Sequence, residues 1–453
     1  MKVAIVGAGW AGMAAAVESA SRGADVTVLE ATRVLGGRAR ALPEQLPDGS
    51  SLTLDNGQHI LIGAYRETLA MMQRVGLNPR DLLLALPLSL PYPDGSGLRT
   101  PAWAARWPAP LDALAAIATT SGWSWRDRVA LVRRSLGWQR TGFTCAPDLT
   151  VAEVCQGLPT RVMQELIEPL CVSALNVPAR QASGTVFLRV MRDALFGAGG
   201  LGFSASSLLL PRCDLSALFP DAAAGWLTKQ HGDRVRIRTG TRVTGLRSHT
   251  SRWALRFDDR EETFDQVIWA TAASAAVQAM SQAEDAPKAL REWAALAQGL
   301  AFTAITTVYA WGDGIRLSAP MLALREGPAQ FVFDRGQLDA HPAARGVLAF
   351  VVSASEGERD PLQARVLSQA ARELSLPSLQ AVQTVVEKRA TFACVPGVQR
   401  PPAHVAPGLW VAGDYVHGPY PATLEGAVRS GLQAAAGTSG QPQVPTGSIS
   451  PAT

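Results

Sequence analysis

The sequence predicts an α/β protein with more than one domain, and three observations support that expectation. The chain has 453 residues, which is too long for one compact core. Hydrophobic residues make up 47% of the chain and charged residues 18%, which excludes a largely disordered or coiled-coil protein. A glycine-rich motif near the N-terminus lies between two short strand-forming runs, an arrangement typical of parallel α/β folds.

The N-terminal segment contains the parts of one βαβ unit in order. Residues 2–6 (KVAIV) and 26–29 (VTVL) predict short buried strands, and residues 13–18 predict a helix between them. The motif Gly7-Ala8-Gly9-Trp10-Ala11-Gly12 joins the first strand to the helix, and Glu30 follows the second strand. This order and spacing predict a Rossmann-like dinucleotide-binding unit.

Each part of this unit has a physical task in binding a dinucleotide. Gly7 permits a tight turn, and Gly9 lets the backbone approach a pyrophosphate that faces the start of the helix. Gly12 lets the helix pack closely against the strand. We expect the Glu30 carboxylate to accept hydrogen bonds from ribose hydroxyls.

Two later segments add glycines and charge of the same kind. Residues Leu35-Gly36-Gly37-Arg38 allow close backbone approach and supply positive charge for a pyrophosphate. Residues 408–414 (GLWVAGD) predict a buried strand that closes on Gly413 and Asp414, and residues 422–431 (ATLEGAVRSG) predict a helix rich in small residues. The N-terminus of that helix would stabilise negative charge on an electron-rich ring such as a reduced flavin.

Together these motifs are similar to the FAD-binding set of the amine oxidase and phytoene desaturase superfamily. The resemblance implies non-covalent FAD in a Rossmann-like fold of the glutathione-reductase type, with an interleaved α+β substrate domain. It implies that Glu30 holds the adenosine ribose and that Val243 contacts adenine through its backbone. Arg38 and Asp414 would serve the pyrophosphate and ribityl region. The implied FAD-binding residues are Gly7, Gly9, Trp10, Ala11, Gly12, Glu30, Gly36, Gly37, Arg38, Gly57, Val243, Gly413, Asp414, Ala422, Thr423 and Leu424, of which the last three would lie against the isoalloxazine ring.

The same resemblance implies an FAD-binding domain built from separate stretches of the chain, with substrate-domain segments between them. The FAD-binding stretches are residues 1–86, 226–275 and 386–436, and the lipid-binding substrate domain takes residues 87–225 and 276–385. Residues 437–453 are small, polar and contain proline, which predicts a disordered tail.

Three runs of residues point to a branch within the superfamily. Residues 54–65 (LDNGQHILIGAY), 175–178 (LNVP) and 389–392 (RATF) resemble the hydroxysqualene dehydroxylases of hopanoid biosynthesis. That resemblance implies reductive removal of the hydroxyl group of hydroxysqualene to give squalene, with reduced FAD as the hydride donor. It also implies an apolar isoprenoid lipid as substrate and an external reductant of the FAD.

The chemistry of such a reaction requires a proton donor in a dry pocket. An allylic hydroxyl leaves poorly as hydroxide, so a general acid should protonate it, and water would capture the resulting cation. Asp55, Gln58 and His59 are polar residues in an otherwise apolar stretch that predicts a strand. We expect His59 or Asp55 to be the acid, with Tyr420 or His417 as the second choice. Structural roles for these side chains remain open alternatives.

Three other functions remain open from the sequence. A desaturase acting on a carotenoid-like polyene would run hydride transfer in the opposite direction on the same scaffold. An amine oxidase usually carries a lysine near the flavin, and the segment that matches best, residues 301–309, has none. A non-enzymatic FAD-binding scaffold is the third alternative.

The charge balance and the metal-binding residue types exclude other classes. A net charge of +4 is too mild for a nucleic-acid-binding protein. Five Cys and six His are scattered without the spacing of a zinc site, so we expect no metal, and the free Cys suit a cytoplasmic location.

The positive charge is concentrated in one window. Residues 101–140 contain six Arg and two Asp, which equals the whole net charge of +4, together with five of the 12 Trp. Ser124-Trp125-Arg126-Asp127 resembles a capping box, and Val129, Val132 and Leu136 then fall on one helix face. Basic charge, an apolar face and Trp predict peripheral contact with the inner face of the membrane, and a solvated amphipathic helix is the alternative.

Overall fold

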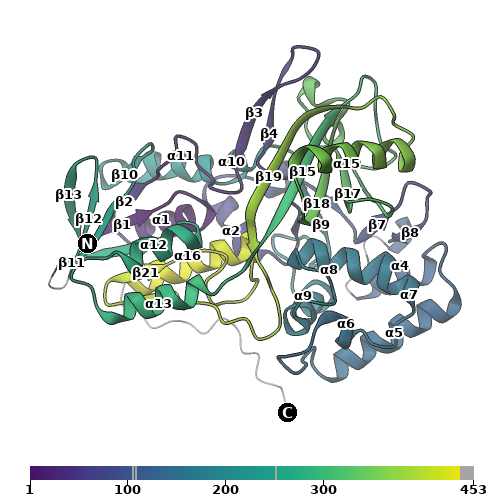
Figure 1. The fold of residues 1–453 in the computed structure, drawn as a ribbon, viewed down its shortest axis with the longest axis horizontal. Coiled ribbons are helices and arrows are strands. Elements are labelled where there is room, and N and C mark those ends of the chain that lie inside the picture. The colour runs from purple at the N-terminus through teal and green to yellow at the C-terminus, as the bar shows by residue number, and fades with distance from the viewer. Residues whose placement is uncertain (105–106, 108–109, 250–251, 439–453) are drawn as a thin grey trace.

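The computed structural model describes residues 1–104, 107, 110–249 and 252–438, and it has the predicted mixed α/β architecture (Figure 1). The last described helix, α16 (Leu424–Thr438), extends two residues into the predicted tail. The rest of that prediction concerns residues 439–453, which lie outside the described residues.

The N-terminal motif belongs to a mostly parallel sheet. Its strands, in spatial order, are β10 (Val235–Arg238), β2 (Asp25–Leu29), β1 (Lys2–Val6), β14 (Gln266–Trp269), β21 (Leu409–Val411) and the antiparallel β20 (His404–Ala406). The central strand β1 is buried from its second residue onward, as expected for a strand covered on both faces. Both strands predicted from residues 2–6 and 26–29 are confirmed.

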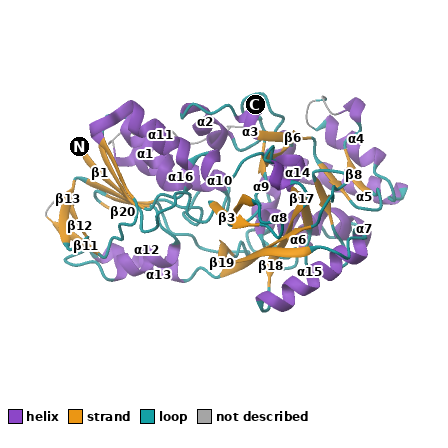
Figure 2. Ribbon diagram, turned by 90° about the horizontal axis from the view of Figure 1, so that it is seen from above, coloured by secondary structure: helices purple, strands orange, loops and turns teal. Residues whose placement is uncertain are grey.

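Helices cover both faces of this sheet. Figure 2 shows α1 (Trp10–Ser21), α11 (Pro220–His231) and α16 on one side, and α12 (Ala273–Ser281) and α13 (Lys288–Gln298) on the other. An antiparallel sheet of β11 (Gly245–His249), β12 (Arg252–Phe257) and β13 (Arg260–Phe264) lies beside it. This layered arrangement places the carboxyl ends of β1 and β2 next to the start of α1.

A second, antiparallel sheet forms the other half of the molecule (Figure 1). Its strands, in order, are β16 (Met321–Ala323), β17 (Phe331–Asp334), β18 (Val347–Ser355), β15 (Phe302–Trp311) and β19 (Gln380–Phe392). Helix α15 (Arg359–Glu373) packs against this sheet. The register between β15 and both of its neighbours shifts around Ala304, so the sheet is irregular there.

Several further helices gather at the end of the molecule away from the parallel sheet (Figure 1). They are α4 (Leu111–Thr119), α5 (Trp125–Arg140), α6 (Val151–Val154), α7 (Thr160–Val162), α8 (Glu168–Leu175) and α9 (Gly184–Phe196). A π-helical turn at Met163–Ile167 joins α7 to α8 without a break. Within the described residues, no helix is long and apolar enough to cross a membrane.

The division into two domains stays a prediction, although the strands of the parallel sheet all fall within residues 1–86, 226–275 and 386–436. Two features cross the predicted boundaries. Strand β19 continues through the boundary at residue 386, and β9 (Leu208–Pro211) pairs with β5 (Leu61–Ile62) and β6 (Leu83–Leu86). Backbone hydrogen bonds therefore link the two halves more closely than separate domains would require.

Candidate functional site

A cavity of about 950 Å³ lies between the parallel sheet and the antiparallel sheet. That volume is at the upper end of the range for ligand pockets in proteins. Segments from most of the chain line it: residues 6–11, 29–32, 36–40, 56–60, 241–246, 269–272, 413–415 and 422–424, with single residues from the antiparallel sheet. Segments that are far apart in the sequence thus meet in one site.

The glycines of the N-terminal motif shape one wall of this cavity. Gly7 has a φ of +105°, and its N–H donates to Leu29 O at 2.8 Å. A Cβ on Gly12 would lie 1.9 Å from Gly7 O, so this glycine lets α1 pack on the strand. A Cβ on Gly9 would meet nothing closer than 3.9 Å and would occupy the cavity itself.

The acidic residue at the end of β2 is held in place by the same motif. Glu30 lines the cavity, and its Oε2 accepts a hydrogen bond from Ala8 N–H at 2.8 Å. Its Oε1 accepts from the N–H and hydroxyl of Thr32, each at 2.8 Å. These bonds fix the carboxylate at the edge of the cavity while leaving lone pairs for ligand hydroxyls.

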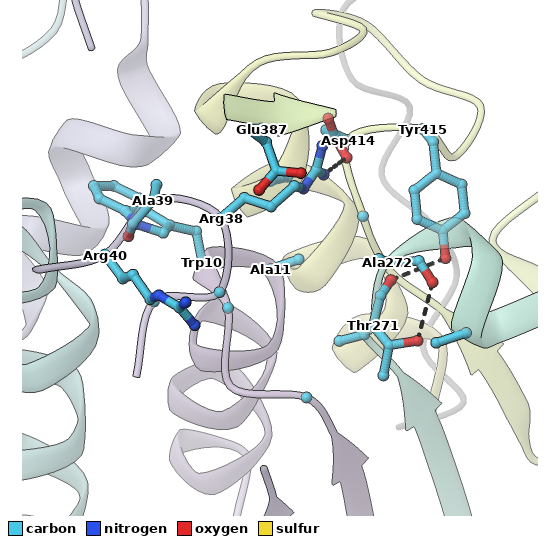
Figure 3. Close-up of a pocket in the computed structure, with 18 of the residues that line it drawn as sticks. Trp10, Ala11, Arg38, Ala39, Arg40, Thr271, Ala272, Glu387, Asp414 and Tyr415 are labelled. Carbon is cyan, nitrogen blue, oxygen red and sulfur yellow. Dashed lines mark hydrogen bonds and ion pairs between the residues drawn. The ribbon is translucent and has the colours of Figure 1, made fainter. Parts of the chain in front are cut away.

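An ion pair joins the second glycine motif to the C-terminal motif. Arg38 Nη2 lies 2.5 Å from Asp414 Oδ1, and its Nη1 donates to the carbonyl of Ala390 (Figure 3). Glu387 lies on the other side of the guanidinium in the same view. Arg38 therefore connects residues of the N-terminal and C-terminal motifs beside the cavity.

The C-terminal motif leads into a helix whose first turn faces the cavity. Ala422 has a φ of +58°, and its N–H donates to Asp414 O at 3.1 Å. Thr423 Oγ1 accepts from Gly426 N–H at 3.0 Å and donates to Tyr420 O at 2.8 Å. Ala422, Thr423 and Leu424 all line the cavity, so the N-terminus of α16 points its partial positive charge toward it.

The residues expected to hold the cofactor come together at this site. All of them except Gly12 line the cavity, and Gly12 lies behind the wall in the packing position predicted for it. Thr241 and Arg242 line the cavity beside Val243, in the segment that precedes β11 at Gly245. The open space over Gly9, with a helix start and the Arg38–Asp414 pair nearby, fits a dinucleotide pyrophosphate.

Two of the five candidate catalytic residues line the cavity. Gln58 and His59 lie in the loop between β4 (Ser51–Asp55) and β5, whereas the sequence predicted a strand there. His59 Nδ1 lies 2.7 Å from Gly57 O, so Nδ1 carries the hydrogen and Nε2 is free to accept one. Burial lowers the pKa of His59, assisted by the positive charge of Arg38 and opposed by the Gly57 contact. His59 is therefore neutral at pH 7.

Asp55 does not line the cavity. Its Oδ1 accepts a hydrogen bond from Leu215 N–H at 2.7 Å, and its Oδ2 lies 3.7 Å from Nη1 of Arg335. Arg335 is itself only 1% exposed, and it donates to Gln58 Oε1 at 3.3 Å. Asp55 thus lies behind Gln58, where its position does not support a role as direct proton donor.

Tyr420 and His417 also lie outside the cavity wall. The Tyr420 ring packs edge-on against Tyr65, with centroids 5.9 Å apart, and the Arg429 guanidinium lies 5.1 Å from its centroid. The Tyr420 hydroxyl hydrogen-bonds to Asp193. His417 is exposed, and its backbone N–H donates to Pro401 O. Tyr420 has a positive φ of +56°.

The structure adds two cavity residues that the sequence did not single out. Tyr65, the last residue of the LDNGQHILIGAY run, lines the cavity, and burial raises its pKa, with the negative charge of Glu425 adding to the rise. Asn176 Nδ2 donates to Thr303 Oγ1 at 2.9 Å and to Thr391 Oγ1 at 3.0 Å. Asn176 thereby ties the end of α8 to β15 and β19. In the sequence, Asn176 could have been noticed as a polar residue directly before Val177 and Pro178.

The antiparallel sheet and the loop before β5 contribute a group of apolar side chains to the cavity wall. Phe331 and Phe333 alternate along β17 and so face the same side, and Phe331 pairs with Val351 on the next strand. Ile60 and Ile305 line the same region. No lysine or cysteine lines the cavity among the described residues.

The parallel sheet and the glycine motifs beside the cavity define a dinucleotide-binding protein, and comparison with known proteins specifies the family. Residues 10–437 match the family described as flavin containing amine oxidoreductase, so the chain belongs to that family. Flavin is accordingly the cofactor type of the site.

Curated relatives and solved structures agree with this placement. The chain is 26% identical to the hydroxysqualene dehydroxylase of Zymomonas mobilis over 445 residues, which is 95% of this chain and 97% of that protein. Its namesake from Sinorhizobium fredii is 26% identical over 96% of this chain and 97% of that protein. Among solved structures, an oxidoreductase from Methanosarcina mazei superposes with a TM-score of 0.72 at 16% identity, covering 96% of this chain and 99% of the other. At that identity the superposition shows the shared fold alone.

Proposed function

We propose that this protein removes the hydroxyl group of hydroxysqualene to give squalene, using non-covalently bound FAD. The similarity to hydroxysqualene dehydroxylases over 95% of the chain is the observation that carries the proposal. The absence of a cysteine from the described cavity wall supports a non-covalent flavin. As the sequence resemblance implies, the product would serve hopanoid biosynthesis, and an external reductant would regenerate the reduced flavin.

The proposed reaction balances with one hydride and one proton. The C–O bond of the substrate breaks, its oxygen leaves as water after taking up the proton, and a hydride supplied by the reduced flavin forms the new C–H bond. The chain's own part is to exclude water and to place the proton. Phe331, Phe333 and Val351 provide an apolar wall against the hydrocarbon. His59 and Tyr65 are titratable side chains that line the same cavity, and we assign them the proton transfer.

Two alternatives are less well supported. The zeta-carotene desaturase of Synechocystis is 32% identical to this chain, but over only 130 residues, or 29% of this chain and 26% of that protein. Cyclohexylamine oxidase from Brevibacterium oxydans shares the fold at a TM-score of 0.62 and 17% identity, over 97% of this chain and 98% of the other. An amine oxidase would call for a lysine near the flavin, and none lines the described cavity.

An anaerobic assay tests the proposed direction of the reaction. The flavin of the purified protein is reduced, hydroxysqualene is added, and the formation of squalene is followed together with flavin reoxidation. We expect one squalene for each flavin reoxidised. If a carotenoid-like polyene reduces the oxidised flavin while hydroxysqualene leaves the reduced flavin unchanged, the protein is a desaturase and the proposal is wrong.

Substituting His59 should slow the reaction without removing the flavin. His59→Gln should reduce the rate of squalene formation by about 100-fold or more, because a positioned proton donor typically contributes that much. Since the pKa of His59 is lowered, the protonated form accumulates only as the pH falls below about 6.5. The wild-type rate should therefore rise in that range and the variant's should not. Tyr420→Phe, which alters a residue outside the cavity wall, is the control and should retain the wild-type pH profile.

A further inference from the structure

Exposed apolar side chains are concentrated on one small part of the surface. Among the described residues, seven of the eleven large hydrophobic side chains that are exposed lie between residues 103 and 136. They are Trp103, Trp107, Leu111, Leu114, Trp125, Val129 and Leu136, and we call them the apolar tip. Trp125 is 75% exposed, the largest fraction of the group. Concentration of this kind on a soluble surface marks an interaction site.

Helix α5 presents its part of the tip as a continuous stripe. At 3.6 residues per turn, Trp125, Val129 and Leu136 point within about 40° of one another. On the opposite face, Leu131 and Trp138 are buried, and Trp138 Nε1 donates to Val154 O at 3.1 Å. The predicted capping box is confirmed by reciprocal bonds between Ser124 and Asp127. Burial on one face and capping at the start hold the apolar stripe outward.

The preceding segment extends the same exposed surface. Leu111 and Leu114 are exposed on α4, whose Ala113 and Ala116 are buried, so α4 also turns an apolar face outward. Trp103 and Trp107 pack edge-on against each other, with ring centroids 4.9 Å apart, and both remain exposed. Figures 1 and 2 place α4 and α5 at the end of the molecule farthest from β1.

Arginines flank the stripe on α5. Arg126, Arg133 and Arg140 are exposed and lie about 60–100° around the helix from Trp125. Within the described part of the chain, none of the three forms an ion pair. By contrast, Arg128 and Arg134 donate to the carbonyls of Thr120 and Val154, so they serve the helix packing instead. The free positive charge therefore lies beside the apolar stripe.

We infer that the apolar tip and its arginines dock the protein onto the surface of an anionic phospholipid bilayer. Tryptophans suit the headgroup region, aliphatic side chains suit the acyl boundary, and arginines beside them attract anionic headgroups. A protein partner that covered this apolar and basic surface would need a complementary acidic surface, whereas an anionic bilayer supplies both negative charge and an apolar interior. The inference does not depend on the proposed reaction, because docking is measured without substrate.

The tip is also linked physically to the cavity. Helix α5 packs against α7, and α7 runs through the π-helical turn into α8 without a break. Ser173, Ala174 and Asn176, at the end of α8, line the cavity. The helical segment against which α5 packs therefore ends at the wall of the site.

Vesicle co-sedimentation of the full flavin-loaded chain tests the inference. Vesicles of phosphatidylglycerol and phosphatidylcholine should bind the protein at low salt. Vesicles of pure phosphatidylcholine should bind it at least about tenfold more weakly. Added salt should release it, since screening weakens charge attraction at the surface. Equal binding to both vesicle types, or no binding to either at low salt, would overturn the inference.

Matched variants locate the contact. Trp125→Ser/Val129→Ser/Leu136→Ser and, separately, Arg126→Gln/Arg133→Gln/Arg140→Gln should each lower binding to anionic vesicles by about tenfold or more. Their controls, Val34→Ser/Leu296→Ser and Arg291→Gln/Arg345→Gln/Arg365→Gln, change exposed side chains elsewhere and should bind as wild type. Wild-type vesicle binding by both tip variants would overturn the assignment. The inference is also wrong if sedimentation equilibrium shows that the wild-type protein is a dimer and that the tip variants are monomers, because the tip would then be a dimer interface.

Discussion

Gly9→Val is expected to abolish flavin binding while leaving the chain folded. Gly9 has an ordinary extended conformation, with φ −73° and ψ −179°, and a Cβ there would meet no atom closer than 3.9 Å. The protein should therefore lose only about 1 kcal/mol, the cost of a poor residue at the start of α1. The new side chain would fill the space in which the pyrophosphate approaches the backbone. We expect the Kd for FAD to rise by at least about 100-fold, or about 2.8 kcal/mol.

Gly12→Val, three residues away, should behave in the opposite way. A Cβ on Gly12 would lie 1.9 Å from Gly7 O, so α1 would have to move away from β1. Overpacking of this kind should lower the free energy of unfolding by about 3 kcal/mol. Urea unfolding and bound-flavin absorbance separate the two variants. If the Gly9→Val protein retains its flavin, the space over Gly9 is not where the pyrophosphate binds.

The buried pair of Asp55 and Arg335 should respond unequally to the loss of either partner. Asp55→Leu is expected to lower the free energy of unfolding by about 3 kcal/mol or more, because it removes the acceptor of the buried Leu215 N–H and the oxygen facing the Arg335 guanidinium, which cannot release its proton. Its remaining carboxylate neighbour, Asp339, lies 3.6 Å from Nη2. At pH 6, Arg335→Met should lower the free energy of unfolding by less than Asp55→Leu does. Burial raises the pKa of Asp55 to about 7 even with Arg335 opposing it, so this carboxyl can keep its proton.

The pH dependence follows from the direction of that shift. Because the folded pKa lies above the unfolded value, Asp55 contributes stability that is fully present below about pH 4 and declines as the pH rises to 7. Without Arg335 the pKa of Asp55 would be higher still, so this loss of stability should continue above pH 7. The reduction in the free energy of unfolding caused by Arg335→Met should therefore be larger at pH 8.5 than at pH 6. Urea unfolding at the two pH values measures it. An Arg335→Met cost equal to that of Asp55→Leu at pH 6 would contradict the explanation.

Local signals identified most of the flavin site. Gly7, Gly9 and Glu30 lie within one short unit, in which each residue's task follows from backbone geometry over a few residues. Arg38, Gly413 and Asp414 could be identified in the same way, because each lies in a short glycine-containing motif. Their sequence spacing is set by the strand–turn–helix itself, so it can be read before any tertiary contact is known.

The catalytic candidates show where this reasoning fails. Asp55 and His59 are close in sequence and both polar, yet one is buried against Arg335 and the other faces the cavity. The chain turns out of β4 directly after Asp55, and the apolar pattern around these residues resembled a continuing strand. Arg335 lies nearly three hundred residues away, and nothing in the local pattern indicates its approach.

The sequence alone determined the family, the parallel sheet and the glycine-lined wall of the flavin site, because these depend on short-range spacing of glycine, strand and helix. It also located the basic, Trp-rich window, because charge and composition can be counted directly. Only the tertiary structure decided which polar side chains reach the cavity and which support it from behind. It also decided which apolar residues of that window face outward and which are buried. Both outcomes depend on which surfaces neighbouring elements cover, and burial is set by contacts between segments far apart in the chain.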